Sequence, residues 1–472
     1  MIWSDVATWT WTLIIYSSGI IAAIDAIWHG RTSQGTLAWV LALAVIPFIA
    51  LPLYLLFGSR RFHGYTKARK ASKKAIKLLK KHQSPLYQDH IKATKNHPTS
   101  PTFRPLETLA RLPLSDNNQV QLLINGEQTF AHIFQALDYA KQSILIQFYR
   151  IQDDQLGKRL QRMLLKKAQQ GVEIYLLYDE IGSSGLNQNY IKTLRKVGIH
   201  CSRFNPLQIQ RRMQVNFRNH RKLIIIDGET SFIGGHNIGD EYLGLNPKIG
   251  PWRDTHVQID GPATLAAQLS FLEDWYWATN KLPTLPWQPY DSGKKAKVLI
   301  IPGGPADSVE TISLSFTHLI GQAQTRLWIA TPYFIPDLNV MGALKLAALK
   351  GIDIRILLPQ KTDSLLVPLA THSYVTELSQ QGIQFFQYQA GFMHQKVMLI
   401  DQHLTFVGSA NLDNRSLRIN FELNALIESE EMASQIETML EHDFSQSKPY
   451  PLKPTKLHTL LTKAARLFSP IL

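Results

Sequence analysis

The chain has 472 residues, of which 45% are apolar and 18% charged, so it is not a wholly disordered or fibrous protein and needs more than one structural unit. Its single cysteine, Cys201, excludes an intramolecular disulfide framework and a multi-cysteine metal site. The net charge of +14 indicates a phosphate-bearing partner such as nucleic acid or anionic lipid, and the position of the charge decides between them.

Two long apolar stretches open the chain. The first covers about residues 6–28, with Asp25 as its only charge, and the second, residues 36–57, has no charged residue. At about 1.5 Å per residue, each matches the ~30 Å hydrocarbon layer of a membrane. We therefore expect residues 1–58 to form a two-helix transmembrane hairpin, although two prolines interrupt the second stretch. A cleaved signal peptide and a buried core helix are the alternatives.

A strongly basic segment follows. Residues 60–81 contain ten Lys or Arg and no acidic residue, which leaves +4 for the remaining chain. By the positive-inside rule this side faces the cytoplasm, and we expect the segment to contact anionic lipid headgroups; a topology signal without lipid contact is the alternative. The small remaining charge disfavours a nucleic-acid partner. Residues 59–105 as a whole are predicted to be this basic juxtamembrane segment and a linker.

The remaining chain predicts an α/β fold that is built twice. Strand-length apolar runs alternate with helix-length periodic segments. A strand, a helix and a second strand predicted in residues 143–178 recur in residues 326–358, with a glycine at the matching helix end in each. We expect two pseudo-twofold-related domains, residues 106–290 and 291–472, each a mixed sheet flanked by helices.

An extended motif occurs once in each predicted domain. Residues 220–237 and 394–411 both match H-x-K-x4-D-x6-G-[GS]-x-N. One chance match of its five fixed letters has odds of about one in ten thousand, so two copies at equivalent places are not chance. The matching residues are His220, Lys222, Asp227, Gly234, Gly235 and Asn237 in the first copy, and His394, Lys396, Asp401, Gly408, Ser409 and Asn411 in the second.

The motif supplies the groups needed for phosphoryl chemistry. Side chains two positions apart on a strand share a face, so each His is expected beside its Lys. Two His, two Lys, the side chains of Asn237 and Asn411 and nearby backbone amides could then surround one phosphate. One neutral imidazole attacks the phosphorus and the other protonates the leaving alkoxide, while Lys and Asn stabilise the developing charge. The two ammonium groups supply positive charge, so we expect no metal or other cofactor.

Four carboxylates complete the candidate site. Asp227 and Asp401 lie an odd number of positions after the motif His, which places them better for tying a hairpin turn than for the chemistry. A catalytic His needs a carboxylate on its other ring nitrogen, and Asp254 and Glu422 are the candidates. Each follows the His of its own half in a strand-like run. Either could instead be an ordinary strand-end charge.

The duplicated motif resembles the signature of the phospholipase D superfamily. With the two apolar stretches, and with WRD and NLDNRSLRINFE after the two motifs, the chain is similar to the bacterial cardiolipin synthases over essentially its whole length. The resemblance implies a multi-pass enzyme of the bacterial inner membrane, with cytoplasmic catalytic domains. Such enzymes join two phosphatidylglycerol molecules into cardiolipin and release glycerol through a phosphohistidine.

The resemblance also assigns residue roles. It implies that His220 is the nucleophile and His394 the acid and base, with the Lys and Asp of both motifs in the catalytic signature. The second-motif Ser409 is replaced by Gly235 in the first motif. Only the second half would therefore offer a hydroxyl to the phosphate, while backbone amides remain available in the first.

Other functions stay open from the residues alone. The same six His, Lys and Asn side chains could hydrolyse a phosphodiester, as a phospholipase or nuclease, or transfer phosphatidyl with another donor or acceptor. A non-catalytic membrane scaffold is the third alternative, although it has no need of paired His and Lys. The sequence leaves the oligomeric state open.

Overall fold

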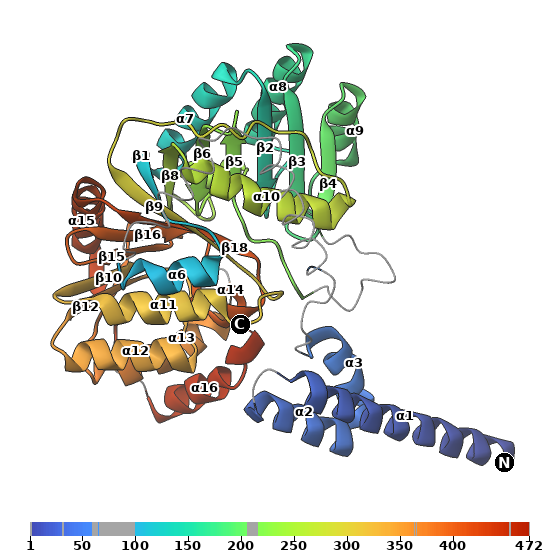
Figure 1. Cartoon of the computed structure of the whole chain (residues 1–472). Coiled ribbons are helices and arrows are strands. Elements are labelled where there is room, and N and C mark those ends of the chain that lie inside the picture. Colours follow the sequence, from blue (N-terminus) through green and yellow to red (C-terminus); the bar gives the residue numbers. More distant parts are fainter. Residues whose placement is uncertain are drawn as a thin grey trace.

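The computed structural model describes residues 2–30, 33–58, 65, 100–204, 216–362, 364, 366–452 and 455–471. A group of N-terminal helices stands beside a two-part α/β body (Figure 1). The predicted basic segment, residues 60–81, lies outside the described residues except for Tyr65.

The apolar stretches fold into α1 (Ile2–His29), α2 (Ser33–Val45) and α3 (Pro47–Phe57). Among the described residues, one segment, Thr8–His29, is long and apolar enough to cross a membrane, by length and composition. The second predicted span is divided at Ile46, because Pro47 begins α3 and has no N–H with which to continue α2. Asp25 of α1 accepts a hydrogen bond from the hydroxyl of Tyr54 in α3 (2.7 Å), so the one charge of the first stretch is satisfied within the helix group.

The α/β body is organised by one long sheet, fifteen strands wide in the described chain. Its first half runs β4 (His200–Phe204), β3 (Glu173–Asp179), β2 (Ser143–Phe148), β5 (Leu223–Ile226), β6 (Thr230–Gly234), β8 (Thr255–Asp260) and β1 (Ser115–Ile124). The second half continues with β9 (Ala296–Gly303), β18 (Glu422–Glu428), β16 (Leu404–Gly408), β15 (Val397–Ile400), β10 (Arg326–Ala330), β12 (Asp353–Pro359), β13 (Gln384–Tyr388) and β19 (Ser447–Pro449). Apart from the edge strand β19, the two halves have the same order. They meet where β1 and β9 pair antiparallel.

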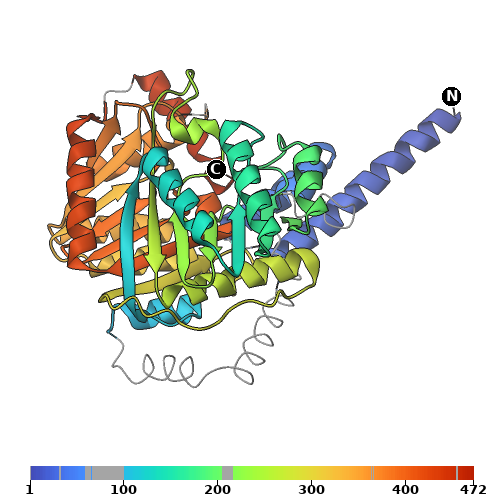
Figure 2. The same cartoon turned by 90° about the horizontal axis from the view of Figure 1, so that it is seen from above.

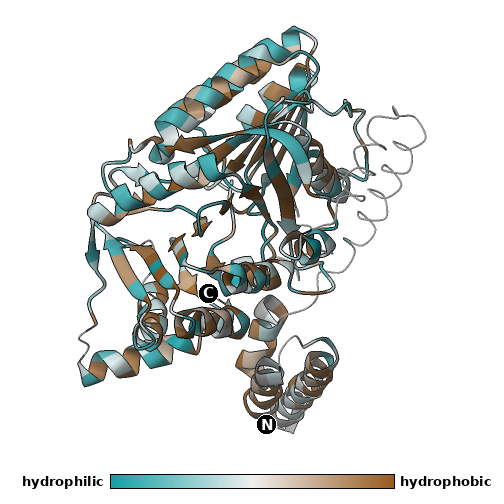
Figure 3. Cartoon of the chain, turned by 60° about the vertical axis from the view of Figure 1, so that its left-hand side comes forward, coloured by the Kyte–Doolittle hydropathy of each residue, from teal (hydrophilic) through white to brown (hydrophobic). Residues whose placement is uncertain are grey.

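Helices cover this sheet on both faces. The first half carries α7 (Asn125–Tyr139), α8 (Gln155–Gln169), α9 (Gln188–Lys196) and α10 (Ala263–Thr279). The second carries α11 (Thr311–Gln322), α12 (Leu338–Leu349), α13 (Leu366–Ser379), α14 (Asn414–Arg418), α15 (Glu430–Ser445) and α16 (Lys456–Arg466). Figure 2 shows helices of both halves around the joined sheet, and Figure 3 shows apolar strands inside more polar helix surfaces.

The two halves share a core. Residues of both halves, such as Val257, Leu272, Leu399 and Ile436, belong to one buried cluster on which α10 and α15 pack. Separate clusters lie under α7 to α9 and under α11 to α13. The two halves therefore share one hydrophobic core at the centre of the body, and each has a separate core beneath its outer helices.

The duplicated mixed sheet predicted from the sequence is confirmed. The predicted strand–helix–strand units are β2–α8–β3 and β10–α12–β12. Gly171 and Gly351, with φ of 85° and 80°, follow the two helices in the left-handed conformation that glycine adopts without a steric penalty. The expected start of the first domain, residue 106, falls inside α6 (Phe103–Ala110), which packs on the core of the second half.

A buried ion pair ties the halves together. Arg253, in β7 (Trp252–Arg253), donates from Nε and Nη2 to the two oxygens of Asp443 in α15, at 2.8 Å each. The Asp443 side chain is 0% exposed and also accepts a hydrogen bond from Gln395 (2.7 Å). Because Asp443 cannot reach water, Arg253 and Gln395 must stabilise its negative charge.

Arg253→Met is expected to destabilise the protein by about 3–5 kcal/mol, because it leaves Asp443 buried without its ion partner. The matched control is Lys297→Met, which breaks the exposed Lys297–Glu428 pair, 47% and 28% exposed. That change should alter stability by no more than about 1 kcal/mol. Thermal unfolding of the detergent-solubilised proteins measures both, and equal small shifts would contradict the prediction.

Candidate active site

The two motif histidines lie in extended segments that lead into central strands. His220 precedes β5 and His394 precedes β15. The sequence placed both on the strands themselves, but their backbones bond across to the other half of the protein. The N–H of His220 donates to the carbonyl of Phe421 (2.9 Å), and that of His394 donates to the carbonyl of Arg253 (2.7 Å). Each motif therefore contacts the opposite half at its histidine.

The histidine–carboxylate pairs cross between the halves for the same reason. His220 Nδ1 lies 3.1 Å from both carboxylate oxygens of Glu422, and His394 Nδ1 lies 2.7 Å from Asp254 Oδ2. Both carboxylates are 0% exposed. The sequence identified Asp254 and Glu422 but associated each with the His of its own half. A carboxylate on Nδ1 selects the tautomer whose Nε2 carries the free electron pair.

The imidazoles are neutral near pH 7. Burial lowers the pKa of His220, with the nearby charge of Glu422 opposing this effect. Burial, followed by the positive charge of Lys396, lowers the pKa of His394 to about 3. Burial alone would raise the pKa of Asp254, but Lys396 and His394 outweigh it and hold the pKa below its usual range. The pairs are thus neutral imidazole on carboxylate, the form in which imidazole is nucleophilic.

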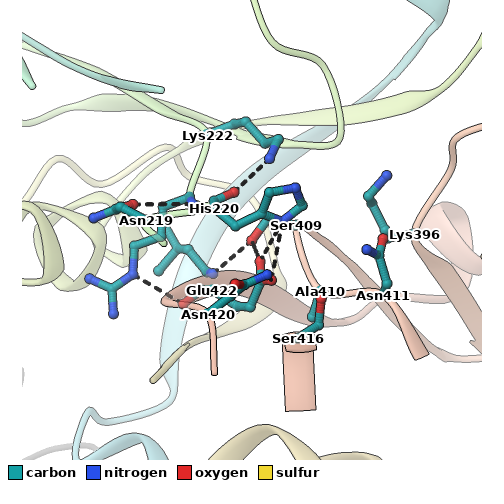
Figure 4. Close-up of polar contacts among 12 residues, drawn as sticks. Asn219, His220, Lys222, Lys396, Ser409, Ala410, Asn411, Ser416, Asn420 and Glu422 are labelled. Atoms are coloured by element: carbon teal, nitrogen blue, oxygen red, sulfur yellow. Dashed lines mark hydrogen bonds and ion pairs between the residues drawn. The ribbon is translucent and has the colours of Figure 1, made fainter. Parts of the chain in front are cut away.

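The motif lysines are buried beside the histidines. Lys222 Nζ donates to the carbonyl oxygen of His220 (2.6 Å), and Lys396 Nζ lies 3.1 Å from His394 Nε2. Figure 4 shows Lys222 next to His220 and Lys396 on the facing half. Burial lowers the pKa of Lys222 to about 7, and only part of this is offset by Glu422. An anion bound here would restore the charge on this amine.

One pocket of about 690 Å³ contains groups from both motifs. Both imidazoles and the side chains of Asn237 and Asn411 line it. The two histidines expected from separate halves therefore face one cavity. Its other lining residues are Tyr149, Arg150, Arg218, Glu241, Tyr242, Lys248, Ile249, Trp252, Tyr333, Lys361, Thr362, Phe392, Asp413, Arg415 and Asn420. In the described chain, no group of three or more His, Cys, Asp or Glu is placed to hold a metal ion.

The two asparagines line the pocket with part of their amide already bonded. Asn237 Nδ2 donates to the hydroxyl of Tyr242 (2.9 Å), and Asn411 Nδ2 donates to Asp413 (3.1 Å). An amide nitrogen carries two N–H groups, so each asparagine has a second N–H that can donate to a ligand in the pocket.

The motif aspartates lie away from this pocket. Asp227 accepts hydrogen bonds from the backbone N–H groups of residues 141–143, just before and at the start of β2. Asp401 does the same for residues 324–326 at the start of β10. Both adopt positive φ, 54° and 53°, in hairpin turns. Their inclusion among the catalytic residues is therefore corrected: they fix the strands on which the site is built, as the spacing indicated.

Ser409 and Gly235 contact carboxylates rather than an open phosphate site. The hydroxyl of Ser409 donates to Glu422 and accepts from the N–H of Leu423 (2.9 Å). A Cβ on Gly235 would lie 2.0 Å from Asp254 Oδ1, and the Gly235 N–H already donates to a backbone carbonyl. The expected phosphate contacts from this hydroxyl and this amide are thus corrected to support of the two carboxylates.

A buried polar network behind Glu422 escaped the sequence analysis. Asp274 of α10 accepts hydrogen bonds from Arg221 Nη1 (2.8 Å), Asn219 Nδ2 (2.8 Å) and the hydroxyl of Tyr65. Arg221 Nε donates in turn to the backbone carbonyl of Glu422 (3.1 Å). One signal was available: Arg221 is the variable residue between His and Lys, on the opposite strand face. A charged residue there requires a buried partner.

Anion binding is predicted to take up a proton at Lys222. Above pH 7 the empty site holds mostly the neutral amine, so a bound anion must draw a proton to it. The affinity for tungstate, an oxyanion of constant charge in this range, should fall about tenfold per pH unit above pH 7. Isothermal titration calorimetry measures this dependence. Lys222→Met should remove it and Lys166→Met, at an exposed site on α8, should retain it; the same slope in both variants would implicate another group.

Known proteins match this chain along nearly its full length. The family model "Cardiolipin synthase, PLD-like domain" matches residues 133–254 and 316–444, and the "Phospholipase_D-nuclease N-terminal" model matches residues 19–59. Cardiolipin synthase A of Pseudomonas putida is 44% identical over 468 residues, 97% of each chain. The Pseudomonas aeruginosa protein of the same name is 43% identical over 461 residues, 96% of this chain and 94% of that one.

A solved structure supports the fold independently. The phosphatidylserine synthase of Haemophilus influenzae superposes with a TM-score of 0.61 at 17% identity, and the match covers 79% of this chain and all of that one. The two matched segments of the family model contain one motif histidine each, together with most of the strands and helices around it. The chain therefore belongs to the cardiolipin synthase family of proteins with duplicated PLD-like domains.

Proposed function

We propose that the chain is a cardiolipin synthase, which transfers a phosphatidyl group from one phosphatidylglycerol to another and releases glycerol. The observation that carries this proposal is the single pocket lined by His220 and His394, each bonded at Nδ1 to a buried carboxylate. Two such imidazoles provide one nucleophile and one proton carrier at the same phosphorus. Relatives named Cardiolipin synthase A along nearly the whole chain supply the substrate class.

The first half-reaction forms the phosphohistidine. Nε2 of His220 attacks the phosphorus of the donor lipid, an N–P bond forms, and the bond from phosphorus to the glycerol oxygen breaks. The negative phosphodiester raises the proton affinity of the neighbouring imidazole, so that His394 carries the proton that it gives to glycerol. Lys222, Lys396 and the two asparagines stabilise charge on the non-bridging oxygens. His220 is assigned as nucleophile because the first-motif His has this role in the superfamily.

The second half-reaction reverses these movements. A hydroxyl of the second phosphatidylglycerol gives its proton to His394 and attacks the phosphorus, and the bond from phosphorus to His220 breaks. Glu422 holds the His220 ring in place through both steps, and Asp254 does so for His394. The enzyme returns to its starting protonation state.

A membrane location fits a substrate with two acyl chains. We place residues 1–58 in the bacterial inner membrane as two spans, with α2 and α3 as an interrupted second span. The basic residues 60–81 then lie on anionic headgroups at the cytoplasmic side. Large apolar side chains on α1, such as Trp9, Ile20 and Ile27, are 60–76% exposed, as expected for contact with lipid.

Hydrolysis is the second candidate function, because the same histidines would transfer phosphatidyl to water. The direct test gives purified protein phosphatidylglycerol in mixed micelles with a chelator and follows cardiolipin and free glycerol. Formation of cardiolipin and release of glycerol in equal molar amounts support the synthase. Phosphatidic acid without cardiolipin supports a phospholipase, another lipid product supports a different acceptor, and no turnover supports a scaffold.

The histidine roles make a separate prediction. His220→Ala should abolish trapping of labelled phosphatidyl on the protein in an alkaline detergent quench, which preserves an N–P bond, because the attacking nitrogen is gone. His394→Ala should leave a slow first step. His318→Ala is the control, since His318 bonds the carbonyl of Thr102, away from the pocket. Label recovered on His394 in the His220→Ala protein would reverse the assignment.

A further inference from the structure

The two halves carry different residues at equivalent positions on the walls of the pocket. The motif spacing of 174 residues aligns Arg218 with Phe392 and Glu241 with Arg415, and all four line the pocket. Similarly, the spacing of 168 that relates Asp254 to Glu422 relates Trp252 to Asn420. Two matching ends of one pocket therefore carry different chemistry.

The end beside His394 is aromatic. The Trp252 ring lies 5.0 Å from the His394 ring and 4.8 Å from Phe392, and Tyr242 packs on Trp252 at 4.7 Å. Its acidic residue, Glu241, pairs with Arg150 at 3.4 Å. This wall suits apolar or neutral parts of a lipid.

The end beside His220 is cationic. Arg218 has a side chain only 7% exposed and pairs with the buried Asp179 at 3.3 Å. Arg415 donates from Nη1 and Nη2 to the side chain and backbone oxygens of Asn216, at 2.9 and 3.0 Å. Among the described residues no carboxylate lies within ion-pair distance of Arg415, although the charges of Asp413 and Glu422 act on it, and its two hydrogen bonds leave three of its five N–H groups for a ligand. Both guanidinium groups line the same pocket as His220.

The proposed reaction already assigns the lysine pair to the phosphate that reacts. The proposed reaction brings a second phosphate into the pocket, because the acceptor lipid is itself a phosphodiester and a three-carbon glycerol joins the two phosphates in the product. A pocket of about 690 Å³ has room for both groups. Guanidinium groups are suited to phosphate because their planar N–H fork matches two oxygens.

We propose that Arg218 and Arg415 form a second phosphate subsite, which binds the phosphodiester of the acceptor lipid while its glycerol hydroxyl attacks. This inference rests on the proposed function and deepens it: the subsite makes phosphatidylglycerol a better acceptor than a neutral alcohol. Asn216 and Asp179 hold the two guanidinium groups in position.

The test compares two acceptors in one preparation of protein. Cardiolipin formation uses a phosphate-bearing acceptor, whereas incorporation of labelled glycerol into phosphatidylglycerol uses a neutral one, and both share the donor step. In Arg415→Gln the ratio of cardiolipin formation to glycerol incorporation should fall about tenfold or more, the loss expected for a charge-assisted phosphate contact. Arg415→Lys, which keeps the charge, should retain most of the ratio.

The control variant is Arg418→Gln on the same helix, whose side chain bonds Asp337 rather than lining the pocket. Its ratio should equal that of the wild type. Because the ratio is internal to each preparation, it does not depend on the fraction of protein that folds. An unchanged ratio in Arg415→Gln, whether both rates fall together or neither falls, would overturn the subsite while leaving the synthase intact. A wild-type protein that makes no cardiolipin would overturn both proposals.

Discussion

The bond between each motif histidine and a carboxylate of the other half is the interaction on which the site depends. His220 is oriented by Glu422, and His394 by Asp254. Neither half contains a complete pair, so an imidazole with a defined tautomer exists only when the two halves are packed together. The continuous sheet and the shared core beneath it thus have a direct chemical consequence: they set the position of two ring nitrogens in one pocket.

Buried ion pairs extend this dependence into the core. Asp274 on α10 supports the segment that carries His220, through Arg221. Asp443 on α15 supports the segment that carries Asp254, through Arg253. The two long helices therefore have equivalent roles, although the arginine sits on the histidine segment in one half and on the carboxylate segment in the other. Buried charges are costly when unpaired, so such networks favour one arrangement of the halves over alternatives.

The two halves remain equivalent around the carboxylates that orient the histidines, and they differ at the pocket walls. At the carboxylates, Gly235 leaves room for Asp254, while Ser409 holds the longer Glu422 by a hydrogen bond. The exchange of Gly for Ser thus accompanies the exchange of Asp for the longer Glu, and both carboxylates still reach an imidazole. At the pocket walls no such compensation occurs, and equivalent positions of the two halves carry different chemistry.

The sequence by itself determined the fold class, the duplication and the phosphate chemistry, because these follow from local periodicity and from residue types at fixed spacing. It also placed Asp227 and Asp401 in turns, since their odd spacing is a property of a single strand. Only the tertiary structure decided which carboxylate meets which histidine, because that contact joins residues about 140 and 200 positions apart across the interface between the halves. The support of Glu422 by Arg221 and the cationic end of the pocket are decided in the same way, by packing between distant segments that no local pattern encodes.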